Sequence, residues 1–358
     1  MFGHWETVTA NWRSFVTMIF GSFVAGSTPQ GGGAVAFPVF TKVFETPASV
    51  ARTFSLSIQA IGMGSAALSI LLSGKSVSKR AIAGGGTAAI VGFFLGLFVL
   101  ADPMTAFWQS RIPESFVKVT FTVVLAALAY IVYLALDEGE CGTWYLPVWN
   151  RRVWVGLGIA GLLGGVITSL IGSGADVFAF LFLVIVAGLH PRIAVPTSVI
   201  IMALVSVVGL VTLGLGHGQL STEVVDGMVV AVGGSAIDPV PAARFDVWGL
   251  WISAVPAVIW GAPLGTMFVH SLNERHLISF LAIMAGIEVV STAIFLPQLR
   301  SDPWLLTYAL VGLAVSVLAV RWLHAHRDGL LGSAAPSKVD AMLRESVAAR
   351  QAAERAAD

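Results

Sequence analysis

Long apolar runs alternate with short polar connections along most of the chain. Charges and clusters of Pro and Gly bound each run, and each run predicts a helix because a helix satisfies its own backbone groups inside lipid. The runs cover 14–27, 32–44, 53–73, 81–101, 115–136, 153–171, 177–189, 194–216, 248–270, 276–296 and 304–323. The pattern predicts an all-α polytopic membrane protein.

Two places in this pattern are irregular. The runs 14–27 and 32–44 are each too short to span a bilayer comfortably and are split by GSTPQGGG, and GSGAD splits the runs 153–171 and 177–189 in the same way. Irregular backbone at membrane depth is tolerated only where protein or a water-lined cavity satisfies its amides, so both breaks are candidate elements of a site. We interpret each pair as a helical hairpin; one interrupted span per pair is the alternative.

The two halves of the chain resemble each other. Aligning GGGAVAFPVFTKVFETPASVARTFSLS with GSGADVFAFLFLVIVAGLHPRIAVPTSVI, at an offset of about 144 residues, places Pro47 opposite Pro191 and Thr53 opposite Thr197. Each half is then a hairpin plus about three transmembrane helices. Because a hairpin makes no net crossing, three spans invert the second half relative to the first, and inverted repeats are typical of secondary transporters.

This repeat predicts the organisation of the chain. It has an N-terminal segment (1–13), a first membrane repeat (14–136), a connecting loop (137–152), a second membrane repeat (153–296), an additional C-terminal transmembrane helix (297–323) and a polar cytoplasmic tail (324–358). The scheme gathers Lys75, Lys79, Arg80, Arg151, Arg152, Arg192, Arg275, Arg321 and Arg327 on one side. The excess of positive charge predicts that this side is cytoplasmic, although Lys42, Arg52 and Lys118 are among the cations on the other side.

Composition supports the membrane assignment and excludes other classes. Hydrophobic residues make up 56% of the 358 residues and charged residues 11%, and the mean hydropathy is +0.86, which a water-exposed domain does not tolerate. Twenty basic and twenty acidic residues give no net charge, so nucleic-acid binding is not expected. The single cysteine, Cys141, excludes an internal disulfide framework, and no cofactor is expected.

The glycine-rich tips are the first candidate site. In the first hairpin Gln30 precedes Gly31, Gly32 and Gly33, whose unobstructed amides face the break beside the positive end of a helix dipole. This arrangement favours an anion, whereas the alternative is that the glycines only allow close helix packing.

The second tip offers Gly172, Ser173 and Gly174 and then differs at Asp176, whose carboxylate repels an anion. Asp176 either caps the half-helix that follows or carries a proton coupled to transport, with direct substrate contact as a third alternative.

Further polar groups lie inside apolar runs. Glu288 is a second candidate for proton coupling; the alternative is a neutral or paired structural acid. Gln59 is interpreted as a hydrogen-bonding residue between helices. Thr53, and Thr197 with Ser198, place hydroxyls at equivalent positions after each hairpin, either to complete an anion site or to cap a helix. The pairs Gly92 and Gly96, Gly161 and Gly165, and Gly261 and Gly265 have the small-xxx-small spacing of helix packing.

The paired glycine-rich hairpins, the Pro and Thr-Ser spacing after each, and the later elements IVGFFLGLFV and IWGAPLGTMFV resemble the sulfite exporter TauE/SafE-like permeases. QGGG matches the family's first glycine motif, and GSGAD is a degenerate form of the second. The resemblance implies a carrier of the bacterial inner membrane that moves sulfite, sulfonates or related small organic anions, with export the expected direction and no ATP hydrolysis.

The hypothesis is therefore a secondary transporter with its anion between the two tips, at Gln30, Gly31, Gly32, Gly33, Thr53, Gly172, Ser173, Gly174, Thr197 and Ser198. The expected partners are the anion and the lipid bilayer, and a homodimer is left open. One alternative is an anion channel that uses the same hairpins as a filter. The other is an intramembrane enzyme with Asp176 and Glu288 as paired carboxylates.

Overall fold

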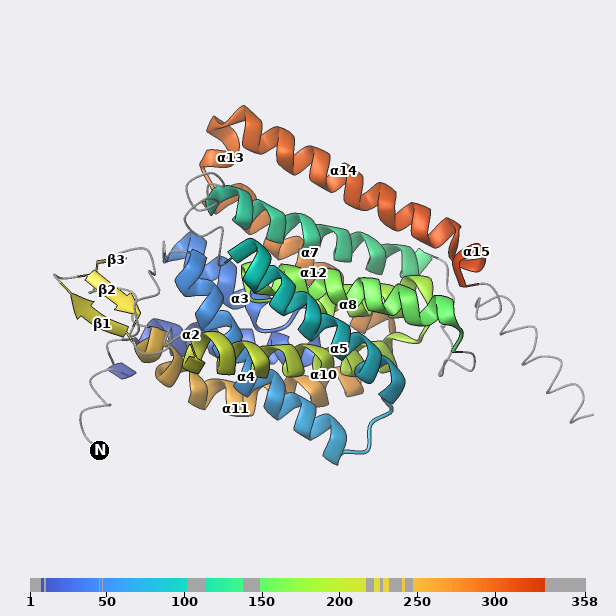
Figure 1. Ribbon diagram of the computed structural model, residues 1–358, viewed down its shortest axis with the longest axis horizontal. Coiled ribbons are helices and arrows are strands. Elements are labelled where there is room, and N and C mark those ends of the chain that lie inside the picture. The colour runs from blue at the N-terminus through green and yellow to red at the C-terminus, as the bar shows by residue number, and fades with distance from the viewer. Residues whose placement is uncertain are drawn as a thin grey trace, which may run out of the picture.

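A computed structural model describes residues 8–9, 11–44, 46, 48–101, 114–137, 149–216, 222–225, 228–231, 240–241, 247–272 and 274–331. Most of the helices run along the long axis of the molecule (Figure 1). Within the described ranges, six helices are long and apolar enough to cross a membrane, at Val50–Leu72, Lys79–Phe98, Arg151–Ile171, Pro191–Gly216, Val247–Val269 and Pro303–Ala325. The prediction of an all-α polytopic membrane protein is confirmed.

Every predicted run corresponds to a helix, and several continue into a π-helical segment (η). The order is α2 (Trp12–Ser27), α3 (Gly33–Pro38), η1 (Val39–Val43), α4 (Ala48–Leu72), α5 (Lys79–Leu95), η2 (Gly96–Ala101), α7 (Glu114–Asp137), α8 (Arg151–Ile171), α9 (Ala175–Leu181), η3 (Phe182–Val186), α10 (Pro191–Gly209), η4 (Leu210–Gly216), α11 (Val247–Ser271), α12 (Glu274–Phe295), α13 (Gln298–Ser301), α14 (Pro303–Ala325) and α15 (Arg327–Leu331).

Two details differ from the sequence-based expectation. Helix α4 begins at Ala48, five residues before the predicted start, because Arg52 does not mark the membrane boundary: its Nη1 donates to the Ser169 carbonyl at 3.5 Å inside the bundle. The connection before α11 contains a small antiparallel sheet of β1 (Thr222–Val225), β2 (Met228–Ala231) and β3 (Val240–Pro241). Cys141 and the tail beyond residue 331 lie outside the described residues.

Each broken pair of runs is a hairpin. At the open end of the first hairpin, the Arg13 guanidinium of α2 lies 5.9 Å from the centroid of the Phe44 ring, which follows η1. In the second hairpin, α8 and α9 are so close that a Cβ on Gly164 would lie 2.8 Å from Ala175 Cα. Both arms of each pair therefore run back toward the end at which the pair began, so the alternative of one interrupted span is wrong.

The two hairpins enter the bundle from opposite ends. The first begins beside the start of α11, where Ser14 Oγ donates to the Leu250 carbonyl at 2.8 Å. The second leads into α10 beside the end of α11, where Arg192 Nη2 donates to the Leu272 carbonyl at 2.9 Å. This opposite entry supports the inverted repeats, which remain a prediction.

Several of the cations assigned to one side share one end of the molecule. Lys75 Nζ donates to the Thr266 carbonyl near the end of α11 at 2.8 Å, and Arg192 donates to Leu272 at the same end. Lys42, which the scheme counts among the cations on the other side, is instead buried in the bundle, with 8% of its surface exposed.

Paired glycines bring helices from the two halves into backbone contact. On the α5–α8 interface, a Cβ on Gly165 would lie 2.7 Å from the Phe93 amide nitrogen, and one on Gly161 would lie 2.6 Å from the Gly85 carbonyl oxygen. On the α2–α11 interface, a Cβ on Gly265 would lie 3.0 Å from the Ser27 amide nitrogen. The predicted packing role of the small-xxx-small pairs is confirmed, because in lipid such close approach is a main source of helix association.

Helix α14 lies beside α7 at the edge of the bundle (Figure 1). Tyr308 and Thr120 join the two helices through a hydroxyl contact of 2.7 Å, while large apolar side chains such as Trp304 and Leu318 are exposed on α14. This exposure fits a helix that faces lipid.

The glycine contacts predict a sharp difference between two positions of α8. Gly165→Ala should lower the free energy of unfolding by about 1–3 kcal/mol, because its Cβ has no room against α5. Gly158→Ala is the matched control: nothing lies within 4 Å of its added Cβ, and alanine favours a helix over glycine by up to about 1 kcal/mol. Thermal unfolding of the detergent-purified variants compares them, and equal midpoints would contradict the packing argument.

Candidate functional site

The two hairpin tips meet inside the protein. Tip 1 (residues 28–32) and tip 2 (residues 172–174) are joined by Ser173 Oγ, which donates to the Gln30 carbonyl at 3.2 Å. Ser173 is 1% exposed and Gln30 is 2% exposed. The two tip elements that the sequence predicts to flank one site are therefore adjacent, and their contact is buried.

Helix α4 holds tip 2 through an amide side chain. Gln59 Nε2 donates to the Gly172 carbonyl at 2.7 Å and to Ser55 Oγ at 2.9 Å. Ser55 Oγ in turn donates to the same Gly172 carbonyl at 3.3 Å. The carbonyl at the break of the second hairpin thus has hydrogen-bond partners deep inside the protein, and the interpretation of Gln59 as a hydrogen-bonding residue between helices is confirmed.

Two of the three consecutive glycines at the first break, Gly31 of tip 1 and Gly33 at the start of α3, are required by this junction. Gly31 has φ +67°, and a Cβ on it would lie 2.5 Å from Gln59 Oε1 and 2.8 Å from Asp176 Oδ2. A Cβ on Gly33 would lie 2.5 Å from Ser55 Oγ. Gly32 instead faces α2, where a Cβ added to it would lie 3.3 Å from the Cβ of Ala25. The triple glycine therefore serves both the junction and the packing of the hairpin.

Three buried polar atoms near the junction have no hydrogen-bond partner within the described structure: Gln30 Nε2, Gln59 Oε1 and Asp176 Oδ2. The last two both lie beside Gly31. Leaving a buried polar atom unpaired costs about 1–3 kcal/mol, so such atoms mark places where a ligand or proton fits.

Asp176 stabilises the start of α9. Its Oδ1 accepts from the Val177 amide at 3.0 Å, and the residue is fully buried. The N-cap position of α9 is Gly174, so Asp176 is not the cap but an acidic residue of the first turn that accepts one of the free amides there. Oδ2 is the unpaired atom and faces Gly31, so the same side chain also contributes to the tip junction.

The hydroxyls that follow the hairpins do not all gather at the tips. Thr53 is buried on α4, two residues before Ser55. Thr197 Oγ1 accepts from the Ser78 amide at the start of α5, and Ser198 Oγ donates to the Val195 carbonyl of its own helix. The residue that caps α10 is His190, so Thr197 and Ser198 are neither caps nor, in this conformation, parts of the tip junction.

A cavity of about 170 Å³ lies between the first hairpin and α12. Its lining is mostly apolar, and its polar lining residues are Gln30 of tip 1, Lys42 of η1, and Glu288 and Ser291 of α12. The cavity therefore connects the tip to the two buried charges of this region.

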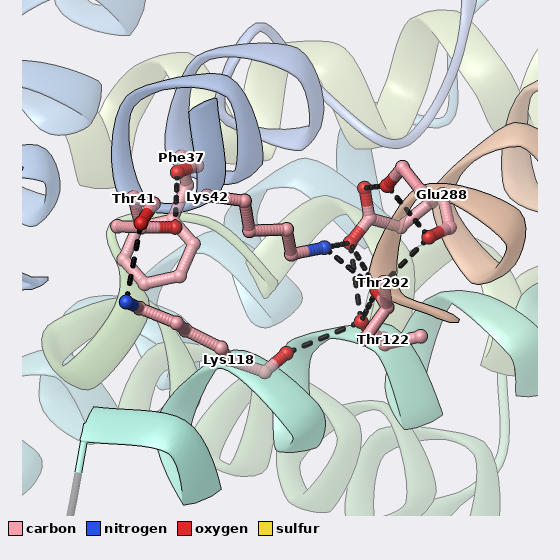
Figure 2. A network of polar contacts seen from close by, with 8 residues as sticks. Phe37, Thr41, Lys42, Lys118, Thr122, Glu288 and Thr292 are labelled. Atoms are coloured by element: carbon pink, nitrogen blue, oxygen red, sulfur yellow. Dashed lines mark hydrogen bonds and ion pairs between the residues drawn. The ribbon is translucent and has the colours of Figure 1, made fainter. Parts of the chain in front are cut away.

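Lys42 and Glu288 form a buried ion pair. Lys42 Nζ lies 2.5 Å from Glu288 Oε1 and donates to Thr292 Oγ1 at 2.7 Å. Thr122 Oγ1 of α7 donates to Glu288 Oε1 at 3.1 Å. Figure 2 shows these side chains converging from the first hairpin, α7 and α12. Glu288 is thus a paired acid, and its partner is Lys42 rather than Asp176.

Sequence reasoning misses Lys42 and Ser55 as parts of this region. Lys42 lies near the end of the predicted run 32–44 and is counted only as a cation on the other side, although a second charge inside an apolar segment is the expected partner of Glu288. Ser55 lies one helical turn before Gln59, so the two polar side chains share a face of α4. That spacing is the signal that could have found Ser55.

These features define a class: a polytopic membrane protein with two broken hairpins that meet at a buried polar junction, the architecture of many secondary transporters. The sequence model of the family described as sulfite exporter TauE/SafE matches residues 14–287. The chain belongs to this family, which is a family of membrane transporters. Searches among curated proteins and among solved structures each found no match.

The tip junction predicts a difference between two glycines with positive φ. Gly74→Ala, at φ +64° with nothing within 4 Å of the added Cβ, should cost only the backbone strain of about 1–2 kcal/mol. Gly31→Ala should cost about 1–3 kcal/mol more, because its Cβ meets Gln59 and Asp176. Thermal unfolding measures both, and Gln59→Ala should remove part of the extra cost in the double variant. Equal losses at Gly31 and Gly74 would show that the junction is not tightly packed.

Proposed function

We propose that the protein is a secondary transporter that exports sulfite, a sulfonate or a related small organic anion across the bacterial inner membrane. The anion binds where the two tips meet, and alternating access arises when one hairpin, together with the helix packed on it, moves against the other hairpin and its helix. Family membership supports the class of transporter. The substrate, the direction and the mechanism are the proposal.

The observation that carries the proposal is the buried, unpartnered amide of Gln30. Its Nε2 is a hydrogen-bond donor with no partner in the described structure, and the residue lies both in tip 1 and in the wall of the 170 Å³ cavity. Anionic oxygens are strong acceptors, and a hydrogen bond to a charged group is worth about 1.5–3 kcal/mol. An anion in the cavity beside tip 1 would satisfy this donor.

The helix contacts support movement of two units. The first arm of the first hairpin, α2, packs closely on α11, and the first arm of the second hairpin, α8, packs closely on α5. Each hairpin is thus fixed to a helix of the other half, while the tips meet through a few hydrogen bonds such as that of Ser173 to Gln30. The tip contact is the place where relative movement changes access.

Asp176 constrains the charge of the transported species. Its unpaired Oδ2 at the junction repels an anion when ionised, so a bound anion requires a proton on this carboxylate or a position on the Gln30 side of the junction. Proton coupling is therefore part of the proposal.

Ligand binding is tested by thermal stabilisation of the detergent-purified protein with sulfite, sulfate, sulfoacetate, taurine and lactate. We expect selective stabilisation by sulfite or by a sulfonate. Gln30→Met should weaken that binding by about tenfold to a hundredfold, since it removes a hydrogen bond to a charged group. Gln298→Met, on exposed α13, is the matched control and should bind as the unmodified protein does. Absence of stabilisation by every compound would overturn the proposed substrate class.

Transport itself is tested in proteoliposomes with radiolabelled sulfite. A carrier shows saturable counterflow, in which unlabelled sulfite inside the vesicle drives uptake of labelled sulfite. Single-channel currents without counterflow would identify the channel alternative instead. Gln30→Met should reduce counterflow while Gln298→Met leaves it unchanged.

A further inference from the structure

The cavity beside tip 1 contains a charged centre as well as an amide donor. Lys42 and Glu288 both contribute to its wall, together with Gln30 and Ser291. Water occupies about 30 Å³ per molecule in the liquid, so a cavity of about 170 Å³ has room for a small oxyanion and a few waters. The size suits one small ligand, and in a lining that is otherwise apolar these four polar residues are the groups that could bind its charge.

In this conformation each charged group of the ion pair also has hydrogen-bond partners besides the other charged group. Lys42 Nζ contacts Glu288 Oε1 and Thr292 Oγ1, and the carboxylate also accepts from Thr122 and Ser291. The side chains of Lys42 and Glu288 are 1% and 6% exposed. Removing two charges from water is expensive, and apolar replacements of a buried pair are often at least as stable, so its presence at a membrane cavity points to function.

Charge balance determines what this cavity can accept. An anion that entered beside the intact ion pair would leave a net negative charge in a buried space, which is unfavourable. If Glu288 takes up a proton, its bond to Lys42 weakens, and the anion replaces it as the partner of the ammonium group. The centre is then neutral before and after binding, because one proton and one negative charge enter together.

We propose that the cavity lined by Gln30, Lys42 and Glu288 is the anion-binding site, in which Lys42 binds the anionic group and Glu288 takes up one proton from solution for each anion bound. In this exchange the contact between Lys42 Nζ and Glu288 Oε1 breaks, the proton bonds to the carboxylate, and Nζ donates to an oxygen of the anion. This inference rests on the proposed function: of the two positions considered there it selects the Gln30 side of the junction, and it makes Glu288, rather than Asp176, the group that takes up the proton.

Among the residues that the structure describes, one other charged side chain acts on this centre. Lys118 of α7 exerts an electrostatic effect on Lys42, and its Nζ donates to the Thr41 carbonyl at 3.1 Å, beside Lys42 in the chain. Figure 2 shows the Lys118 ammonium at Thr41, whereas the Lys42 ammonium points away from it toward Glu288. The positive charge of Lys118 favours a bound anion, but it also favours the ionised form of Glu288, so proton uptake has to be driven by the entry of the anion.

The test measures sulfite binding by calorimetry to the full-length protein in detergent, at two pH values. Sulfite itself gains and loses a proton near neutral pH, so its own titration changes the measured affinity with pH. That change is the same for the unmodified protein and for Glu288→Gln, so the difference between the two proteins isolates the contribution of Glu288. The unmodified protein should bind more tightly at lower pH, by up to about tenfold per pH unit beyond the effect of sulfite alone. Glu288→Gln should bind without that extra pH dependence. Asp302→Asn, a carboxylate-to-amide change at the start of α14, is the matched control and should keep the extra dependence.

Removal of the cation tests the other half of the proposal. Lys42→Met should weaken sulfite binding at least about tenfold, and Lys42→Arg should retain part of it. Because Lys42→Met leaves Glu288 unpaired and can prevent folding, the double change Lys42→Met with Glu288→Leu removes both charges and keeps the core apolar. It should be folded, as judged by its thermal midpoint, and should not bind sulfite.

The outcomes separate this inference from the proposed function. If Glu288→Gln keeps the extra pH dependence, or if the folded double variant binds sulfite normally, the ion pair is structural and the inference is wrong, whereas the effect of Gln30→Met on binding still stands for the tip site. If the unmodified protein binds no anion of the tested set, the proposed function itself fails.

Discussion

The need to satisfy broken backbone inside lipid shapes the centre of this protein. A helix that stops at mid-depth exposes carbonyls and amides where no water is available, and each unpaired group costs several kcal/mol in the hydrocarbon region. At tip 2 the Gly172 carbonyl is satisfied by Gln59 and Ser55 of α4, and the hydroxyl of Ser173 binds the Gln30 carbonyl of tip 1. The tips therefore depend on each other and on α4, so the fold can keep two broken hairpins only by bringing them together.

This dependence explains the arrangement of the surrounding helices. The hairpins reach the same junction from opposite ends, so each must pass alongside helices of the other half, and glycine pairs on α5, α8 and α11 allow that passage at backbone contact. Larger residues on these faces would separate the helices and pull the tips apart. The close packing of the outer helices is therefore what keeps the two tips near enough to form hydrogen bonds with each other at the centre.

Beside this neutral junction lies a centre of a different kind. The tips offer amides and hydroxyls without net charge apart from Asp176, whereas Lys42 and Glu288 form a buried ion pair that joins η1 to α12 and, through Thr122, to α7. The cavity places Gln30 and this pair in one wall. The cavity thus places a buried charged pair next to the first of the two broken hairpins, in a chain that belongs to a family of membrane transporters.

The sequence by itself determined the membrane class, the positions of the helices and the two glycine-rich breaks. These features depend on the length and hydropathy of each segment and on the spacing of small residues, which are local properties of the chain. The sequence also identified Gln30, Gly31, Ser173, Asp176 and Glu288 as unusual for their surroundings. Only the tertiary structure decided which of these residues meet. In the folded protein Gln59 and Ser55 lie at the junction, whereas Thr197 and Ser198 lie away from it. Glu288 pairs with Lys42, which is 246 positions away in the chain. Partner choice between distant polar groups depends on helix packing and not on local pattern, so no spacing rule in the sequence could specify it.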